Sequence, residues 1–293
     1  LAILIVVITR VPFDAFGDAI EHGPHVKLAI IELLITFSVL CTDSIATWLG
    51  LIAVRLRRPF LTVMAVRGAT YALFVINYAV GQGAFGYYLA KAGVRPLRAT
   101  GATLFLVGTN LATMLVLLSL VWALGDLAVP TARLTWTLTL GCSAFAAYLL
   151  VIALAPHFLA RRELFAPLFD AGLRGHGLAM LGRVPHVFVL VLAQWIALRT
   201  WGIQVPFVVG VLILPIIVIA AALPISPAGL GTAQAAFVYF FQGFAPGLNV
   251  DDRSAHVVAF GIVHFVYGAA ASLLVGLVCV PIAKRRGALR EGT

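Results

Sequence analysis

The stretch Leu223–Phe237, "LPISPAGLGTAQAAF", interrupts a sequence that is apolar on both sides. Two prolines and two glycines, Pro224, Pro227, Gly229 and Gly231, fall within eight residues. Because proline lacks a backbone N–H and glycine tolerates sharp turns, the stretch predicts a break between two helices. In lipid, such irregular backbone persists only where protein or a water-filled cavity satisfies its polar groups. We therefore expect this break to line a cavity.

The composition indicates a multi-pass membrane protein. Of the 293 residues, 62% are hydrophobic and only 11% are charged, whereas about a quarter of a soluble domain is charged. Some apolar runs approach or exceed the ~20 residues that cross a bilayer as a helix. The predicted spans are Val26–Val54, Ala99–Leu124, Leu134–Ala155, Val184–Thr200 and His256–Ile282.

Two further apolar segments are broken. Phe60–Ala92 is interrupted at "NYAVGQGAFG" (Asn77–Gly86), and Val205–Phe244 is interrupted at Pro224–Gly231. In both, the apolar stretch after the break is too short to cross a bilayer. Each is interpreted as a re-entrant helical hairpin. Residues 1–9 are apolar and also too short to span, and they are interpreted as the end of a first helix.

The net charge of +9 would suggest a nucleic-acid partner in a soluble protein. Here the basic residues cluster between apolar segments, so they indicate membrane topology, and no nucleic acid is expected. Both ends of the 60–92 hairpin are basic and are therefore placed in the cytoplasm, as is the C-terminus. The residues that decide this are Arg55, Arg57, Arg58, Lys91, Arg95, Arg98, Lys284, Arg285 and Arg286. The expected location is the cytoplasmic (inner) membrane of the cell.

The order of segments has an internal symmetry. Residues 26–124, with the hairpin 60–92, are followed later by residues 184–282, with the hairpin 205–244, in the opposite orientation. Both hairpins contain Gly-x-Gly, as Gly81-Gln82-Gly83 and Gly229-Leu230-Gly231. Paired broken segments in two inverted halves are typical of transporters with a site near the midplane. The alternative is that an apolar chain rich in glycine and proline contains kinked helices by chance.

The complete expectation is an all-α polytopic membrane protein. A single transmembrane domain covers residues 1–293, with two opposed re-entrant helical hairpins and about six to seven spanning helices. A transmembrane barrel is not favoured, because its strands would alternate polar and apolar residues.

Two segments resemble a known family. "LPISPAGLGTAQAAFVYFFQGF" and "NYAVGQGAFGYYLAKAGV" are similar to signatures of the flippase-like family of the lysylphosphatidylglycerol synthase transmembrane region. The resemblance covers most of the chain. It implies a helical bundle with two opposed re-entrant hairpins that moves lipids between leaflets. The family's glutamate aligns with Gln234, and Gly81 lies near its usual proline, so both hairpin tips are less charged than the family pattern. The resemblance does not include the soluble aminoacyl-transfer domain, and lysyl transfer is not expected.

Charged residues inside apolar segments are the strongest candidates for function. At the centre of a span, a charge such as that of Asp43 costs at least ~2.5–3.5 kcal/mol, and Arg67 is its expected partner. A purely structural pair is the alternative. Glu32 lies eleven residues before Asp43, on the same side of the helix, where it lines a polar pathway or reaches toward the interface. His264 is interpreted as a hydrogen-bonded packing residue.

The predicted substrate-binding residues gather around the hairpin tips. They are Asp43, Arg67, Asn77, Gly81, Gln82, Gly83, Ser226, Gly229, Gly231 and Gln234. The amide side chains among them also commonly form hydrogen bonds between membrane helices. Enzyme motifs, metal-ligand spacings and cofactor motifs are not found, so neither catalysis nor a cofactor is expected.

The leading hypothesis is a transporter of an anionic phospholipid or of a polyprenyl-phosphate-linked lipid. The headgroup would cross through a polar groove while the tails stay in the bilayer. The alternatives are a scaffold subunit for an envelope-lipid enzyme and an ion-coupled transporter of small solutes. The sequence leaves a homo-oligomer open.

Overall fold

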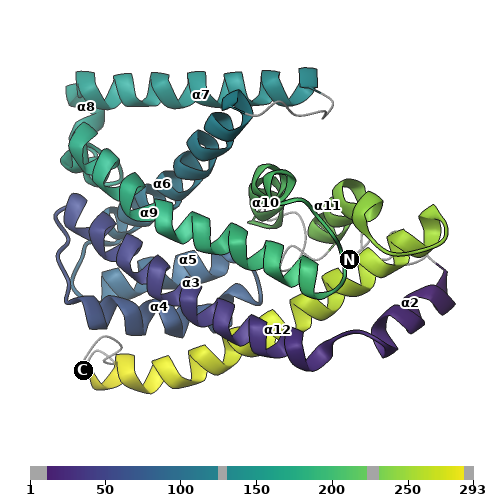
Figure 1. The fold of residues 1–293 in the computed structure, drawn as a ribbon. Helices are drawn as coiled ribbons and strands as arrows, with labels where there is room; N and C mark the ends of the chain where they lie inside the picture. Colours follow the sequence, from purple (N-terminus) through teal and green to yellow (C-terminus); the bar gives the residue numbers. More distant parts are fainter. Residues whose placement is uncertain (1–11, 125–130, 223–230, 287–293) are drawn as a thin grey trace. The chain divides into compact units, whose positions relative to one another are not determined.

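The computed structural model describes residues 12–124, 131–222 and 231–286 (Figure 1). Within these ranges the chain is helical throughout and contains no strand. The helices are α2 (Phe13–Glu21), α3 (His25–Ala53), α4 (Phe60–Phe74), α5 (Tyr78–Lys91), α6 (Pro96–Leu124), α7 (Thr131–Leu154), α8 (His157–Ala160), α9 (Ala166–Thr200), α10 (Phe207–Ala222), α11 (Thr232–Phe241), η2 (Gln242–Phe244) and α12 (Val250–Arg285). The predicted remnant of a first helix, at residues 1–9, lies outside the described residues.

Five of the described helices, α3, α6, α7, α9 and α12, are long and apolar enough to cross a membrane. The predicted all-α class is therefore confirmed, and four predicted spans agree with their helices to within about six residues. The start of the fourth predicted span was wrong. Its helix, α9, begins at Ala166 and not at Val184, and it continues past a non-helical Gly172 (φ 54°) and past Pro185. The sequence predicted about six to seven spanning helices, whereas the described residues contain five helices that are long and apolar enough to span.

Helix α3 exposes a row of large apolar side chains and buries a row of polar ones. Its large apolar residues on one face are about half exposed or more: Ile30, Leu33, Leu34 and Phe37. Its polar residues on another face are buried: Glu32, Thr36, Asp43 and Thr47. A soluble protein would place these faces the other way round. The expectation that Glu32 and Asp43 share a buried side of the helix is confirmed.

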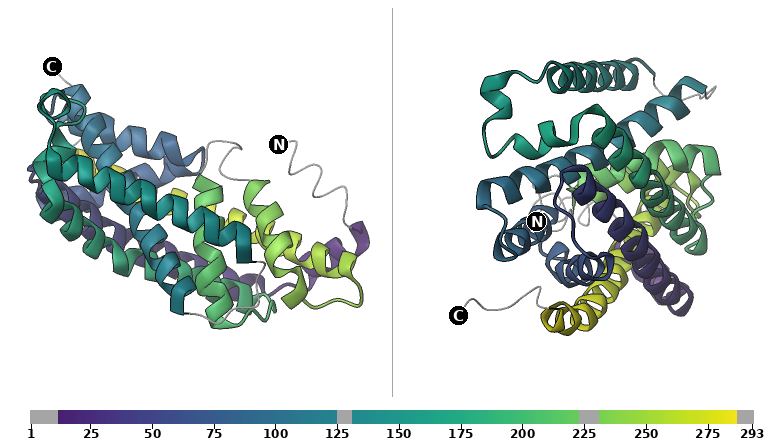
Figure 2. Two further views of the ribbon diagram at one scale, coloured as in Figure 1. Left: turned by 90° about the horizontal axis from the view of Figure 1, so that it is seen from above. Right: turned by 90° about the vertical axis from the view of Figure 1, so that its left-hand side faces the viewer.

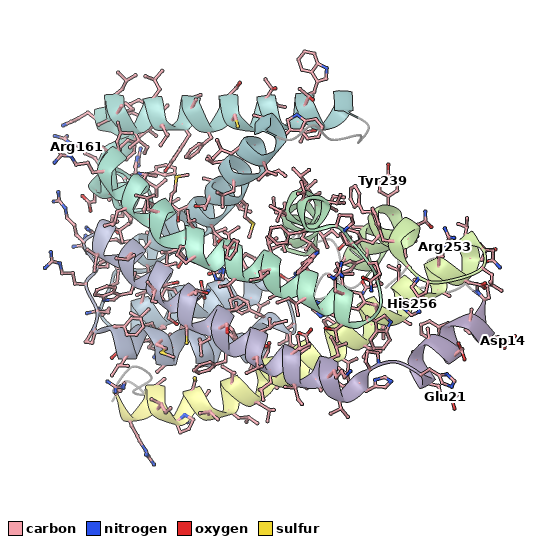
Figure 3. All side chains as sticks on the ribbon, viewed as in Figure 1. Asp14, Glu21, Arg161, Tyr239, Arg253 and His256 are labelled. Atoms are coloured by element: carbon pink, nitrogen blue, oxygen red, sulfur yellow. The ribbon has the colours of Figure 1, made fainter. Side chains whose placement is uncertain are left out.

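Charged side chains outside the spans behave as expected for an aqueous surface. Asp14 and Glu21 are exposed on α2, and Arg161 is exposed just after α8 (Figure 3).

The chain forms two compact units. Unit 1 comprises Leu1–Val39, Ala69–Gly81 and Val189–Val278, and unit 2 comprises Leu40–Gly68, Gln82–Phe188 and Cys279–Thr293. The core of unit 2 is built on Leu51, Phe85, Leu89 and Phe105, all of which are at most 2% exposed. In the core of unit 1, the rings of Phe237 and Phe260 meet edge to face, with centroids 5.5 Å apart.

The first broken segment consists of α4 and α5, which pack against each other in an antiparallel manner. Arg67 of α4 contacts Gln82 and Phe85 of α5, and Phe74 stacks on Tyr78 across the connection. The predicted position of the break, Asn77–Gly86, was wrong. The helix is interrupted only at residues 75–77 and resumes at Tyr78, so that Gly81, Gln82 and Gly83 are helical.

The second broken segment consists of α10 and α11, which lie side by side (Figure 2). Residues 223–230, which contain most of the predicted break, lie outside the described residues. The second limb starts at Thr232, as expected, and it is preceded by Gly231 with φ 95°. An L-residue with a side chain rarely adopts this φ, so glycine is required here.

Candidate functional site

A buried group of charged side chains lies in unit 2, around Asp43 of α3. The Asp43 carboxylate accepts hydrogen bonds from Arg67 of α4 (Nε to Oδ2, 2.7 Å) and from Arg183 of α9 (Nη1 to Oδ1, 2.6 Å). All three side chains are only 4–5% exposed. The predicted pairing of Asp43 with Arg67 is confirmed, and Arg183 adds a second arginine to it. We call these three residues the Asp43 cluster.

The Asp43 cluster holds more positive than negative charge, because two guanidinium groups face one carboxylate. Arg67 also donates to Gln82 (Nη1 to Oε1, 3.3 Å) and lies over the ring of Phe85 at 5.3 Å. The Nε of Arg183 is buried and has no hydrogen-bond partner in the described part of the chain. A buried charge without compensation is costly, so this arrangement favours a nearby anion.

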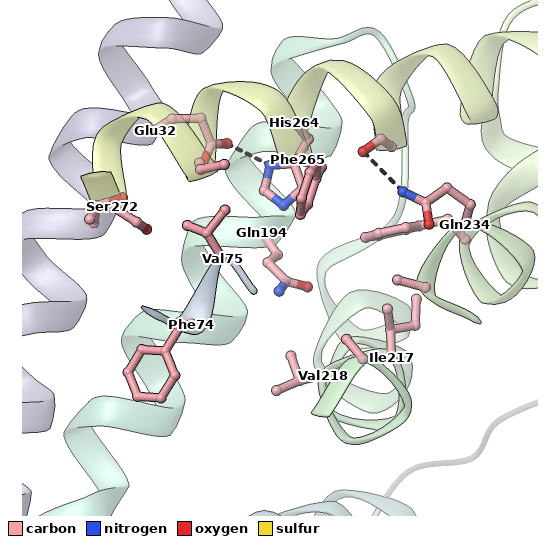
Figure 4. A pocket seen from close by; sticks show the side chains of 17 residues that line it. Glu32, Phe74, Val75, Gln194, Ile217, Val218, Gln234, His264, Phe265 and Ser272 are labelled. Carbon is pink, nitrogen blue, oxygen red and sulfur yellow. Dashed lines mark hydrogen bonds and ion pairs between the residues drawn. The ribbon is translucent and has the colours of Figure 1, made fainter. Parts of the chain in front are cut away.

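A cavity of about 280 Å³ lies in unit 1 (Figure 4). It is lined by residues of α3, α9, α10, α11 and α12, and by the residues at the end of α4. Most of the lining is apolar, including Phe74, Ile217, Val218 and Phe265. The polar residues in the lining are Glu32, Thr36, Gln194, Gln234, His264 and Ser272. The cavity therefore offers a few polar groups within apolar walls.

The polar groups of the cavity are held in defined positions. Glu32 and His264 are joined by a contact of 2.6 Å between Oε1 and Nδ1. Gln234 accepts from the N–H of Gly231 (2.7 Å) and donates to the carbonyl of Gly261 (3.4 Å). The Oε1 of Gln194 is buried and has no hydrogen-bond partner among the described residues, and Figure 4 shows this side chain between α12 and α10.

The predicted site residues fall into separate groups. Asp43 and Arg67 meet in the Asp43 cluster of unit 2, where Arg67 also contacts Gln82. Gln234 lines the cavity of unit 1 and accepts from the N–H of Gly231. Ser226 and Gly229 lie outside the described residues.

The remaining predicted residues have local structural surroundings. The Oδ1 of Asn77 accepts from the N–H of Ala79 (2.7 Å) and so caps α5. Gly81 is buried against the ring of Phe74, and Gly83 is exposed with open space around it.

Sequence reasoning missed three residues of these sites. Arg183 lies just before the predicted span Val184–Thr200 and was not singled out, although "LAMLGRVPHVF" (Leu178–Phe188) is apolar on both sides of it. His264 was interpreted as a packing residue, and its partner Glu32 is 2% exposed. For Gln194, the sequence shows only an amide side chain within an apolar span, and this does not indicate a site.

Comparisons of the sequence with protein-family models and with curated proteins give no match. The fold defines the class of the protein as helical, with five helices suited by length and composition to a multi-pass membrane protein.

Proposed function

We propose that this protein moves a lipid with an anionic or phosphate-linked headgroup between the two leaflets of a membrane. The observation that carries the proposal is the cavity of unit 1, which combines apolar walls with buried polar groups. Its volume of about 280 Å³ is just below the ~300–1,000 Å³ typical of small-molecule sites. It suits a headgroup whose tails stay in the bilayer.

An anionic headgroup is favoured by the start of α11. Ala233 and Gln234, in the first turn of this ten-residue helix, line the cavity. The N-terminal end of a helix carries a partial positive charge and N–H groups without partners in the helix. It therefore attracts phosphate groups.

A polar row along α3 supports a pathway for the headgroup. Its buried polar residues are Glu32, Thr36, Asp43 and Thr47, and the first and last of them are fifteen residue steps apart on the helix. At 1.5 Å per residue this is about 22 Å, most of the ~30 Å thickness of the hydrocarbon core. Within unit 2, the excess positive charge of the Asp43 cluster favours an anion.

The proposal includes two hairpins that enter the membrane from opposite sides. Helices α4 and α5 have 15 and 14 residues, and α10 and α11 have 16 and 10. None of these limbs reaches the ~20 residues of a full span. With the basic residues on the cytoplasmic side, the C-terminus is cytoplasmic and the membrane is the inner membrane of the cell.

The proposal is tested by filling the cavity. The protein is reconstituted into vesicles that carry a fluorescent anionic phospholipid in both leaflets, and leaflet exchange is followed by quenching the outer leaflet. Ala233→Leu adds bulk to the lining and should slow exchange several-fold. Ala236→Leu is the matched control, because Ala236 is half-buried on the same helix but does not line the cavity. It should exchange lipid at the parental rate.

Two results would contradict this function. Exchange no faster than in protein-free vesicles would remove the transport proposal and favour a scaffold subunit. Equal rates for the parental protein and Ala233→Leu, with both well folded, would show that lipid does not use this cavity.

A further inference from the structure

Glu32 and His264 are the only titratable residues among those described as lining the cavity of unit 1. Their side chains are 3% and 18% exposed. The other groups around the imidazole do not titrate: Phe260 stacks on it at 5.2 Å, Phe237 meets it edge-on at 6.4 Å, and Gln194 and Gln234 are amides. The charge of the lining side chains therefore depends on this one pair.

The pair has two charge states that differ by one proton. Its contact joins His264 Nδ1 to Glu32 Oε1, so with an ionised Glu32 the Nδ1 carries the proton and Nε2 is the free nitrogen of a neutral ring. In that state the pair has a net charge of −1. A proton taken from water by Nε2 gives an imidazolium and a net charge of zero. In a cavity of low polarity this difference is large for an anionic ligand.

We infer that the Glu32–His264 pair is a proton site whose occupancy controls entry of the anionic headgroup. With the proton bound, the lining side chains are neutral and the headgroup binds at the start of α11. With the proton released, the carboxylate repels the headgroup. This inference rests on the proposed function and couples it to protons, since binding of lipid and of proton must favour each other equally.

A second polar pair, His25 and Tyr267, lies on the same two helices, near the start of α3. His25, the first residue of α3, lies seven residues before Glu32, which is about 10 Å along the helix. Its Nδ1 is 2.9 Å from the hydroxyl of Tyr267, which follows His264 by three residues on α12. Its Nε2 lies 2.5 Å from the carbonyl of Ile20, so Nδ1 accepts from the tyrosine. His25 is half-buried, and with Tyr267 it forms a hydrogen-bonded pair at this end of the helix.

Proton uptake on lipid binding tests the inference directly. The full chain, in detergent and in weak buffer near pH 7, is titrated with short-chain phosphatidylglycerol, and released or absorbed protons are recorded with an indicator dye. We expect proton uptake, and binding about fivefold or more tighter at about pH 6 than at about pH 8. Short-chain phosphatidylcholine, which has no net charge, should cause no uptake.

Variants test whether the absorbed proton binds to the Glu32–His264 pair. Glu32→Gln keeps an acceptor for His264 and removes the negative charge, so it should bind phosphatidylglycerol equally at both pH values without proton uptake. His264→Gln should also lose the uptake. His256→Gln is the matched control, because His256 lies on the same helix but bonds to the carbonyl of Trp201, away from this cavity. It should retain both uptake and pH dependence.

The possible failures are distinguishable. Binding of phosphatidylglycerol without proton uptake, or uptake that persists in Glu32→Gln and His264→Gln, would overturn the proton site and leave lipid transport standing. Absence of any binding by the folded parental protein would overturn the proposed function together with this inference.

Discussion

Asp43 accepts hydrogen bonds from two buried arginines, so it is the single negative charge that holds the Asp43 cluster together. Removal of either arginine leaves a balanced pair, whereas removal of the carboxylate leaves two buried cations. The three side chains are therefore not equivalent. A simple exchange of the charges of Asp43 and Arg67 would place the new arginine beside Arg183, and it is not expected to restore stability.

Asp43→Asn should destabilise the protein most, by about 3–5 kcal/mol, because both guanidinium groups lose their counter-ion. Arg183→Gln should cost clearly less, because Asp43 keeps Arg67. Thermal unfolding of the purified variants in detergent measures both effects.

The control for this comparison is Asp170→Asn. Asp170 pairs with Arg98, and their side chains are 30% and 35% exposed, so its loss should cost at most about 1 kcal/mol. Equal losses for Asp43→Asn and Arg183→Gln would contradict the account of the cluster.

The partner of Asp43 was predictable because Arg67 is the one basic residue deep inside a broken apolar segment. Arg183 was not, because charge rules assign a whole loop to one side of the membrane. They do not show which basic residue becomes buried when the next helix, α9, starts earlier than predicted. The sequence also contained Glu32 and His264, but their pairing depends on how α3 and α12 pack.

At the scale of elements, the first hairpin shows what the glycine pattern can and cannot predict. Glycine in a helix costs only about 1 kcal/mol relative to alanine, so Gly81 and Gly83 do not by themselves end α5. The break lies just before Asn77, whose side chain caps the new helix. The existence of two limbs was predictable from their length, but the position of the turn was not.

The two glycines of the first Gly-x-Gly should respond differently to alanine. A Cβ at Gly81 would overlap the ring of Phe74, so Gly81→Ala should cost about 1–3 kcal/mol. A Cβ at Gly83 meets nothing within 4 Å, so Gly83→Ala should be neutral or stabilising by up to about 1 kcal/mol. Thermal unfolding in detergent compares them. The same effect for both variants would show that Gly81 does not serve the packing of α4 on α5.

At the scale of the whole molecule, the ends of most spanning helices could be predicted from the lengths of the apolar runs in the sequence. A helix must satisfy its backbone in lipid, so about 20 apolar residues fix a span from the sequence alone. The error at α9 arose because residues 173–183 mix polar and apolar side chains, so hydropathy does not mark them as part of the same helix. The inverted arrangement of the two hairpins stays a prediction, because it depends on which side of the membrane each connection occupies.

The measurement that tests this arrangement most directly is cysteine labelling in intact cells. Single cysteines replace Arg57, Arg95, Arg286 and Asp251, which are all exposed, in a chain whose own three cysteines are changed to alanine. An impermeant thiol reagent is then added from outside. The account predicts labelling at 251 only, with the other positions labelled after the membrane is permeabilised. Labelling at 95 but not at 57 would make α4 and α5 together a span, and would contradict the opposed re-entrant hairpins on which the proposed transport depends.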